Sequence, residues 1–249
     1  MGLAAIVREY GGGCAKRLTG SEPRYWLYGQ VFMHIIEEHM DIQAPLWAEN
    51  REAGENPARG VMEKDNGSVI LFLGGARSGK SALAENIASG FDKVAYIATA
   101  EGIDDEMIER IEQHRSVRPS NWATYEVDGG LSETFEKAAD GADAVIIDCV
   151  TVYVGRRMHK IANDLEIVEE IVDVIKAASV SGKTVLIVSN EVGMGVVPEY
   201  PVGRRYRDLL GIINQRIAAL SDKVILTIAG VPVDIKALGI ADAEYTGLA

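Results

Sequence analysis

The sequence has little that would suit a secreted or membrane-spanning protein. It contains only two cysteines, Cys14 and Cys149, which lie far apart and follow no metal-binding or disulfide pattern, so a reducing cytosol is the simplest location. No apolar run approaches the roughly 18 residues that a membrane-spanning helix needs, and the N-terminus lacks the features of a signal peptide. We therefore expect a cytoplasmic protein with no membrane span.

Basic residues are also in short supply. The 25 Lys and Arg residues face 37 Asp and Glu residues, which gives a net charge of −12. A general nucleic-acid-binding surface must neutralise phosphates with clustered Lys and Arg, so we expect no nucleic-acid partner. Any phosphate site must be local and made largely by backbone groups, in a chain whose 47% apolar and 25% charged residues are ordinary for a globular protein.

The composition changes near residue 60. The polar stretch 49–57 is typical of a linker, so we interpret residues 1–61 as an N-terminal extension, dispensable or partly disordered, with a small accessory segment as the alternative. Residues 62–249 then form a nucleotide-binding domain. His34 and His39 lie in the extension five residues apart, off a common helical face, which favours packed or solvated histidines over a metal pair.

After residue 62, apolar runs alternate with amphipathic segments. The apolar runs predict strands at 69–73, 93–98, 124–127, 144–148, 184–189 and 223–228. The amphipathic segments predict helices at 80–89, 104–114, 131–139, 165–178 and 204–220. Strands so continuously apolar suit a parallel sheet buried on both faces. We therefore expect an α/β fold, a mostly parallel sheet with helices on both faces and a ligand beyond the carboxyl ends of the strands.

A complete Walker A phosphate loop follows the first expected strand. It comprises Gly74, Gly75, Ala76, Arg77, Ser78, Gly79, Lys80 and Ser81. Its glycines let successive backbone N–H groups curl around phosphate oxygens, and the helix that follows presents its N-terminus to the anion. Lys80 would reach the β- and γ-phosphates, and Ser81 would bind Mg²⁺. The context of strand, loop and helix favours a nucleotide site over a chance glycine-rich turn.

Two acidic groups lie where strands or helices are expected to end or begin. Asp148 closes the apolar run 145–147, the Walker B arrangement that supports Mg²⁺ opposite Ser81, although a strand-ending Asp can also serve a turn. The acidic stretch 104–106 is typical of a helix start. A contact with a substrate hydroxyl is the alternative there.

His114 is the candidate nucleophile. It lies near the end of an expected helix and is followed by Arg115 and Arg118. A histidine at this place can simply compensate the helix dipole. The neighbouring arginines also suit a second role, in which a neutral imidazole attacks phosphorus while guanidinium groups hold the phosphates. The residues alone leave both roles open.

Two further polar segments stand out. Residues 189–195 begin where a strand ends and include Gly193 and Gly195, which suit a sharp turn or a close ligand approach. Residues 203–208 place three arginines in the first turns of a long helix. These oppose the helix dipole, so we expect an anionic ligand or a partner chain near them.

With these residues in place, the sequence resembles the bifunctional adenosylcobinamide kinase / adenosylcobinamide-phosphate guanylyltransferase family of cobalamin biosynthesis. The resemblance spans about 67–236 and rests on Gly74–Ser81, Tyr96–Ala100, Asp105–Met107, Arg110–Ile111, His114, Arg118–Pro119, Asn190–Gly195, Val197–Glu199, Arg207–Asp208 and Asn214–Gln215. Residues 155–158 depart from the Asn and leucines usual in the family.

The resemblance implies two reactions. A nucleoside triphosphate, ATP or GTP, phosphorylates adenosylcobinamide, and GMP then passes from GTP to that phosphate through a covalent GMP-histidine at His114. Guanine nucleotide contacts would fall on residues 74–81, Ala98, Thr99, Ala100, Arg115, Ser116, Val117, Arg118, Glu126 and Asp148. The family also implies a RecA-like fold and a homo-trimer. The rival interpretations are a phosphate-loop kinase or ATPase in which His114 is structural, and a nucleotide-binding regulator.

Overall fold

The structure is a computed structural model, and it describes residues 67–100, 118–161 and 163–239. His114, Arg115, Ser116 and Val117, the expected helix at 104–114 and the extension 1–61 all lie outside the described residues. The boundary expected near residue 62 lies outside them too, so it stays a prediction.

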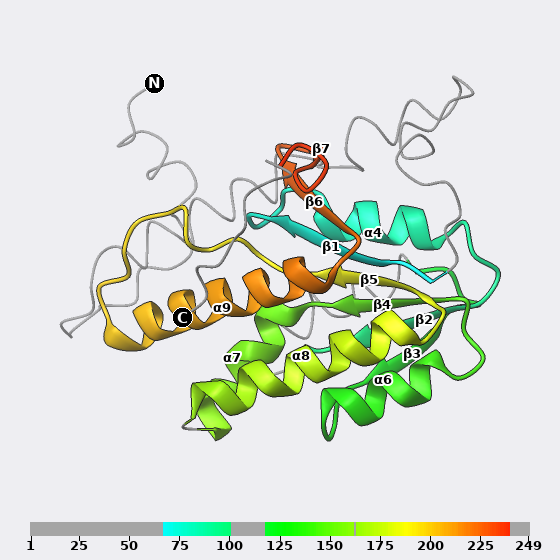
Figure 1. Cartoon of the computed structure of the whole chain (residues 1–249), viewed down its shortest axis with the longest axis horizontal. Coiled ribbons are helices and arrows are strands. Elements are labelled where there is room, and N and C mark those ends of the chain that lie inside the picture. Colours follow the sequence, from blue (N-terminus) through cyan, green and yellow to red (C-terminus); the bar gives the residue numbers. More distant parts are fainter. Residues whose placement is uncertain (1–66, 101–117, 162, 240–249) are drawn as a thin grey trace, which may run out of the picture. The chain divides into compact units, whose positions relative to one another are not determined.

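The described part of the chain forms one seven-stranded sheet in the order β3-β2-β4-β5-β1-β6-β7 (Figure 1). The strands are β1 Val69–Gly74, β2 Val94–Ala98, β3 Ala123–Glu126, β4 Ala144–Asp148, β5 Thr184–Val188, β6 Lys223–Ile228 and β7 Val231–Asp234. Neighbouring strands run parallel except β6 and β7. The expected α/β class with a mostly parallel sheet is confirmed.

Within the described residues, helices cover the two faces of the sheet unequally. These helices are α4 Lys80–Ala88, α6 Leu131–Ala139, α7 Val150–Lys160, α8 Asp164–Val180 and α9 Pro201–Leu220. Because side chains alternate along a strand, Leu71 of β1 points to the core shared with α6, α7, α8 and α9, while Phe72 points to the core shared with α4. None of the described helices is long and apolar enough to cross a membrane.

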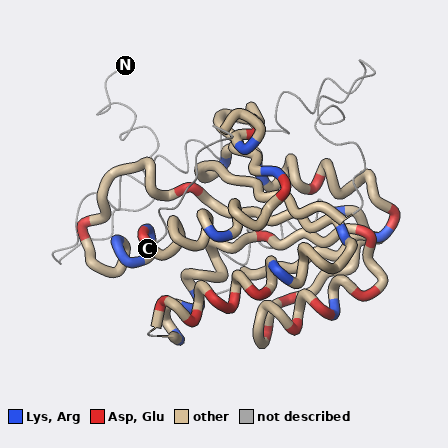
Figure 2. The backbone as a smooth tube through the Cα atoms, in the orientation of Figure 1, with Lys and Arg blue, Asp and Glu red and all other residues tan. Residues whose placement is uncertain are grey.

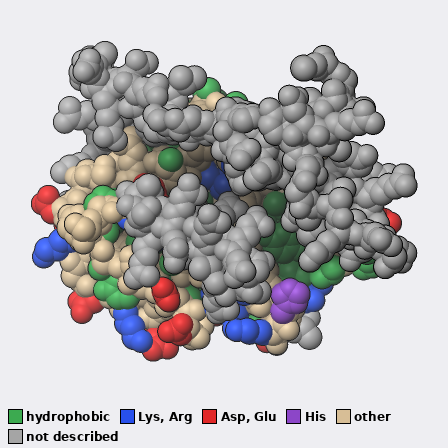
Figure 3. All heavy atoms as spheres, turned by 180° about the vertical axis from the view of Figure 1, so that it is seen from behind, with side chains coloured by type: hydrophobic (Ala, Val, Ile, Leu, Met, Phe, Trp, Pro, Cys, Tyr) green, Lys and Arg blue, Asp and Glu red, His purple; other side chains and the backbone are tan. Residues whose placement is uncertain are grey.

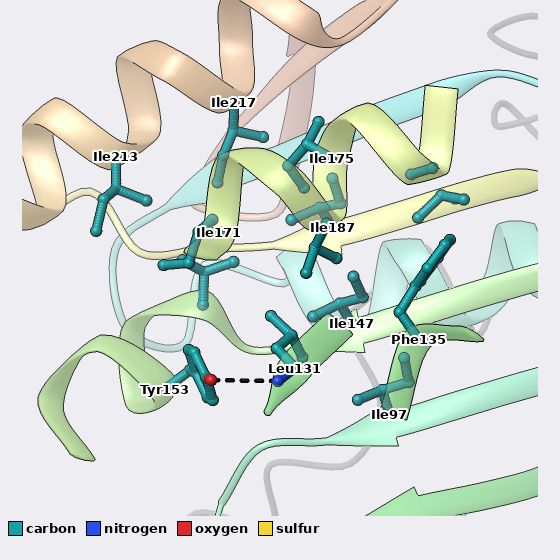
Figure 4. Packing of buried hydrophobic residues seen from close by; sticks show 14 of the residues in the cluster. Ile97, Leu131, Phe135, Ile147, Tyr153, Ile171, Ile175, Ile187, Ile213 and Ile217 are labelled. Atoms are coloured by element: carbon teal, nitrogen blue, oxygen red, sulfur yellow. Dashed lines mark hydrogen bonds between the residues drawn. The ribbon is translucent and has the colours of Figure 1, made fainter. Parts of the chain in front are cut away.

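The larger core is built from β-branched side chains. Ile97, Ile147 and Ile187 of the sheet are fully buried and belong to the same cluster as Ile171 and Ile175 of α8 (Figure 4). Branched side chains are stiff and pack well on a pleated surface. This core fixes the strand register, and the register in turn decides which side chains meet at the carboxyl edge of the sheet.

One polar group interrupts this core. The hydroxyl of Tyr153, in α7, accepts a hydrogen bond from the Leu131 N–H at 3.3 Å and donates one to Glu170 at 2.5 Å. Buried polar groups cost free energy unless they are paired, and both hydrogen-bonding directions of this hydroxyl are used. The contact joins α6, α7 and α8 on one side of the sheet.

Two elements were missing from the sequence-based expectation. Helix α7 falls in a run of β-branched residues, and β7 contains Pro232. Strand β7 returns antiparallel after a tight turn in which Ala229 and Gly230 have positive φ angles of 50° and 81°. Such a turn matches the twist of a hairpin, so the sheet is mixed at this edge.

Charge is spread over the described backbone. Acidic side chains predominate along α8 and arginines lie at the start of α9 (Figure 2), and the face seen from behind carries side chains of both signs among its described residues (Figure 3). The nucleotide site therefore has to be located from backbone geometry and individual side chains.

Candidate active site

The phosphate loop joins β1 to α4 at the carboxyl edge of the sheet. A Cβ added to Gly74 would lie 2.4 Å from Ser78 Oγ and 2.5 Å from the Thr227 carbonyl oxygen, so only glycine fits there. Gly79 has a φ of 95° and caps α4 in the left-handed conformation, which glycine adopts at little cost. The loop geometry thus accounts for two of the three glycines singled out from the sequence.

Neighbouring segments hold the loop from two sides. The Gly230 N–H donates to the Ser78 carbonyl oxygen at 3.0 Å, and the Glu191 N–H donates to the Gly74 carbonyl oxygen at 3.0 Å. The hairpin turn and the segment after β5 therefore brace the loop. A braced loop keeps its remaining N–H groups arranged for an anion, which lowers the entropic cost of binding.

Lys80 and Ser81 begin α4. Lys80 is buried, at 8% exposure, and its Nζ donates to the Gly75 carbonyl oxygen at 3.2 Å, so the ammonium group folds back over the loop. Ser81 is partly exposed in the first helical turn. Both side chains sit at a helix N-terminus, where the partial positive charge favours phosphate.

Asp148 ends β4 on the same edge. Its register partner is Val188 of β5, and Val188 pairs with Phe72 of β1, so a single strand separates Asp148 from the strand that enters the phosphate loop. Ile146 packs in the core on the α4 side, and alternation places Asp148 on that side too. The carboxylate and the loop therefore lie on one side of one edge.

These residues fit Mg²⁺. The Asp148 carboxylate and the Ser81 hydroxyl are hard oxygen ligands, and Mg²⁺ usually takes one or two of these from protein and the rest from phosphates and water. Among the described residues no group of three or more His, Cys, Asp or Glu could hold a metal. A site shared with nucleotide phosphates is the arrangement that this donor set suits.

Tyr96 joins Asp148 to a group of side chains on the α4 side of the sheet. The Tyr96 hydroxyl donates to Asp148 Oδ2 at 2.6 Å, and the Arg118 guanidinium lies over the Tyr96 ring, 3.4 Å from its centroid. Trp122 stacks beside Tyr96. Burial and the Asp148 charge raise the pKa of Glu85 to about 7, while Arg118 opposes that rise.

Thr99 is fully buried and its hydroxyl is used by the protein itself. Its Oγ1 accepts from the Cys149 N–H and donates to the Cys149 carbonyl oxygen, both at 2.8 Å. The peptide bond between Asp148 and Cys149 is cis. Thr99 thus fixes the backbone that carries Asp148, while Ala98 and Ala100 on either side remain partly exposed.

Glu126 lies at the same edge. It ends β3 and pairs with Ala98 of β2, which in turn pairs with Asp148 of β4. The three strand ends are therefore in line, and Glu126 is exposed. The structure brings Glu126, Ala98 and Asp148 onto one edge with the phosphate loop, as expected for residues around a shared ligand.

The residues that depart from the family pattern also contribute here. Arg156, in α7, donates to the carbonyl oxygens of Thr99 and Val127, the latter at 3.1 Å. Arg157 pairs with Glu170 at 2.8 Å. Arg156 therefore stabilises the segments that follow β2 and β3, and Arg157 links α7 to α8; no motif in the sequence indicated either role.

A buried polar network supports the end of β5. Ser189 Oγ donates to Asn214 Oδ1 at 2.7 Å, and Asn214 Nδ2 donates to the Asn190 carbonyl oxygen at 3.1 Å. The Asn190 N–H donates to Thr151 Oγ1 at 2.6 Å. Side chains from α7 and α9 thereby hold the backbone that precedes Glu191, and so help to brace the phosphate loop.

The arginines at the start of α9 have internal partners. Arg204 donates to the carbonyl oxygens of Pro198 and Glu199, Arg205 pairs with Asp164 and Arg207 pairs with Asp208. The sequence had suggested an anionic ligand or partner chain for this cluster. These contacts account for the charges, because carbonyl and carboxylate groups close in space offset the unfavourable helix dipole.

The parallel sheet, the phosphate loop and the acidic strand end on one side of it define an α/β P-loop nucleotide-binding protein. The chain belongs to the cobinamide kinase / cobinamide phosphate guanyltransferase family, whose profile matches residues 70–235. The family membership expected from the motifs is confirmed.

Individual relatives agree with this assignment. The chain is 39% identical over 180 residues to the bifunctional adenosylcobalamin biosynthesis protein CobU of Salmonella typhimurium and 38% identical over 180 residues to CobU of Escherichia coli. Each match covers 68% of this chain and 99% of the relative. CobP of Pseudomonas aeruginosa is 38% identical over 173 residues, which cover 67% of this chain and 96% of the relative.

A solved structure is also similar. It is a KaiC-like protein from Pyrococcus horikoshii OT3, with a TM-score of 0.41 and 16% identity, and the match covers 65% of this chain and 71% of that chain.

Proposed function

We propose that this chain phosphorylates adenosylcobinamide with a nucleoside triphosphate and then transfers GMP from GTP to the adenosylcobinamide phosphate. One observation carries the proposal: a braced phosphate loop lies beside Asp148 in a chain that matches 99% of the length of two relatives named as bifunctional. The enzyme class, a transferase with kinase and guanylyltransferase activities, follows from family membership.

In the kinase step the substrate hydroxyl oxygen attacks the γ-phosphorus. The bond from that phosphorus to the β–γ bridging oxygen breaks, the nucleoside diphosphate leaves, and the hydroxyl proton is released. The loop N–H groups and Lys80 would hold the β- and γ-phosphates and stabilise the charge that develops there. Ser81 and Asp148 would hold Mg²⁺, which supplies charge neutralisation between the phosphates.

In the guanylyl step we propose that His114 is the nucleophile. An imidazole nitrogen attacks the α-phosphorus of GTP, pyrophosphate leaves, and a phosphoramidate bond joins GMP to the histidine. A phosphate oxygen of adenosylcobinamide phosphate then attacks the same phosphorus, and the imidazole is released. Splitting the transfer lets a neutral group rather than an anion make the first attack on GTP.

Nucleotide contacts are proposed for residues of three segments. Arg115, Ser116, Val117 and Arg118 would bind phosphates after the histidine, and Glu126 would bind the base or ribose. The position of Arg118 over Tyr96, beside Asp148, supports this assignment. Ala98 and Ala100 would contribute backbone contacts, and Thr99 would support them from within the protein.

The same proposal includes the setting of the enzyme. Reactions that consume nucleoside triphosphates suit the cytoplasm, where these are made, and the corrinoid is a small-molecule partner. A homo-trimer is expected from the family resemblance. Size-exclusion chromatography with light scattering would measure the assembly directly.

Labelling with α-³²P-GTP tests the central step. We expect protein-bound label that is stable in alkali and lost in acid, as a phosphoramidate is, and no label on the His114→Asn variant. An equally labelled His114→Asn variant, or unlabelled wild-type protein, would contradict the guanylyl-transfer mechanism. A phosphate-loop kinase with a structural histidine would instead phosphorylate adenosylcobinamide without forming the label.

A further inference from the structure

We propose that Tyr96 is a positioning residue that holds Asp148 and Arg118 in a fixed relation beside the phosphate loop. The inference rests on the proposed function, in which Asp148 binds Mg²⁺ and Arg118 binds the nucleotide phosphates. It concerns a residue whose side chain is too deeply buried to touch the nucleotide itself, at 1% exposure.

The position of Tyr96 in the sheet gives its hydroxyl access to Asp148. Tyr96 pairs with Ile146, and two residues later Ala98 pairs with Asp148. Both Tyr96 and Ile146 face the α4 side, so the long phenol side chain extends along the strand direction toward the carboxyl edge. Its hydroxyl reaches Asp148 Oδ2 at 2.6 Å.

The ring of Tyr96 holds Arg118. The guanidinium carbon lies 3.4 Å from the ring centroid, within the range of a strong cation–π contact, which gains energy when it is desolvated. The Tyr96 ring also stacks with Trp122, with 6.5 Å between the ring centroids and an interplanar angle of 26°. The Tyr96 side chain therefore donates a hydrogen bond to Asp148 and packs against the Arg118 guanidinium.

Two buried polar atoms near Tyr96 lack a hydrogen-bond partner among the described residues. They are Glu85 Oε1 and Arg118 Nε. Buried polar atoms are nearly always paired in native proteins, so an acceptor and a donor left open at the edge of a nucleotide site indicate a place for water or ligand atoms. Tyr96 contacts one of these residues and neighbours the other.

The Tyr96 hydroxyl donates to one carboxylate oxygen of Asp148, Oδ2, and leaves the other oxygen for a ligand. Groups of this kind, which orient a metal ligand without touching the metal, typically change metal affinity by 10- to 100-fold when they are removed.

The contact also links two parts of the proposed mechanism. Arg118 lies four residues after His114, the proposed nucleophile, in the sequence. Asp148 is a proposed Mg²⁺ ligand. A guanidinium already held against a buried ring loses little further freedom when it binds phosphate. Tyr96 thereby serves the guanylyl step through Arg118 and both steps through Asp148.

Three variants of the full-length protein test this inference. Tyr96→Phe removes the hydroxyl and keeps the ring, so binding of a fluorescent GTP analogue should need about tenfold more Mg²⁺, while binding without Mg²⁺ is unchanged. Tyr96→Leu also removes the ring, and labelling with α-³²P-GTP at saturating Mg²⁺ should fall at least tenfold below that of Tyr96→Phe. Tyr153→Phe is the matched control.

Tyr153 is a suitable control because it is also a buried tyrosine whose hydroxyl contacts a carboxylate, Glu170, on the opposite face of the sheet. Its loss should lower thermal stability without changing the Mg²⁺ dependence. If Tyr96→Phe loses stability like Tyr153→Phe but keeps the wild-type Mg²⁺ dependence, Tyr96 is merely structural and the inference is wrong. Should Tyr96→Leu fail to fold, Tyr96→Phe still decides through the Mg²⁺ titration.

The two proposals can fail separately. A wild-type protein that binds the GTP analogue with Mg²⁺ but forms no labelled histidine would contradict the guanylyl-transfer mechanism. The Mg²⁺ titration of Tyr96→Phe needs only nucleotide binding, so it still supports or overturns the positioning role.

Discussion

Thr99 holds the backbone of Cys149 through both hydrogen-bonding directions of its hydroxyl, each at 2.8 Å. The contact crosses from the end of β2 to the end of β4 and adjoins Asp148, whose carbonyl oxygen accepts from the Thr99 N–H at 3.1 Å. A residue expected to contact the nucleotide thus has its side chain committed to the protein. Its hydroxyl acts on the site through the position of Asp148.

Replacing Thr99 tests that role. Thr99→Val keeps the shape but leaves the Cys149 N–H unpaired, while the Cys149 carbonyl oxygen keeps the Tyr153 N–H as a partner, so the free energy of unfolding should fall by about 2 kcal/mol. Thr99→Ser retains the hydroxyl and should lose less than about 1 kcal/mol. Urea denaturation of the two variants measures the difference, and equal losses would show that the hydroxyl contributes nothing.

The tight turn at Gly74 makes a sharp prediction about the phosphate loop. Gly74→Ala would force a Cβ against the Thr227 carbonyl oxygen at 2.5 Å, so the loop must shift and affinity for GTP should fall by at least tenfold. Gly75→Ala meets no atom within 4 Å and should stay folded with an unshifted loop. Calorimetric titration with GTP and thermal unfolding compare the two variants.

Removal of the Lys80 ammonium group should impair both half-reactions if one phosphate loop serves them. Lys80→Ala should lower the rate of phosphorylation and the rate of labelling with α-³²P-GTP by about 10²- to 10³-fold, the usual loss for a preorganised donor aimed at developing charge. Both rates are measured on the same preparation. Unchanged kinase activity in this variant would indicate a second nucleotide site.

Glu85 should make stability depend on pH. Its pKa is raised from 4.5 to about 7 in the folded protein, so the folded state binds the proton more tightly than the unfolded state does. The contribution of Glu85 to the free energy of unfolding is fully present below pH 4.5 and is lost as the pH rises through about 7. Glu85→Gln should therefore be the more stable protein at pH 8, by about 3 kcal/mol, with the gap closing near pH 4.5.

Chemical denaturation of wild type and Glu85→Gln at a series of pH values measures this gap. The difference between the two proteins isolates Glu85 from the other titrating groups. A gap that is constant with pH would mean that the carboxyl group keeps an ordinary pKa in the folded state.

A variant that begins at Met62 should retain the folded domain and both activities. The family match starts at residue 70, and the bifunctional CobU relatives are covered over 99% of their length by 68% of this chain. Circular dichroism and the two activity assays compare this variant with the full chain. An insoluble or inactive variant would show that residues 1–61 belong to the fold.

Much of the fold follows from local pattern. The first strand and the phosphate loop were predicted together because an apolar run, three glycines and a helix-forming segment are adjacent in sequence and form by short-range geometry. Helix α7 was not predicted, because Val150, Val152 and Val154 have low helix propensity. Burial of Val150, Tyr153 and Val154 on one helical face stabilises it instead.

Some residues of the candidate site follow from local sequence motifs, whereas other contacts depend on tertiary packing. Lys80, Ser81 and Asp148 could be named from motifs, since each motif is continuous in the chain. The internal partners of Arg204, Arg205 and Arg207 could not be named in this way, and the sequence pointed to an anionic ligand or a partner chain. These partners become visible only once α9 and the loop before it are packed.

The sequence by itself determined the nucleotide-binding loop, the alternation of strands and helices, and the family, because each is encoded in short continuous segments of the chain. Only the tertiary structure decided that Tyr96 contacts Asp148, a residue 52 positions away, and that Arg118 lies on the ring of Tyr96. Those contacts depend on the register of parallel strands, which is set by the packing of both sheet faces at once.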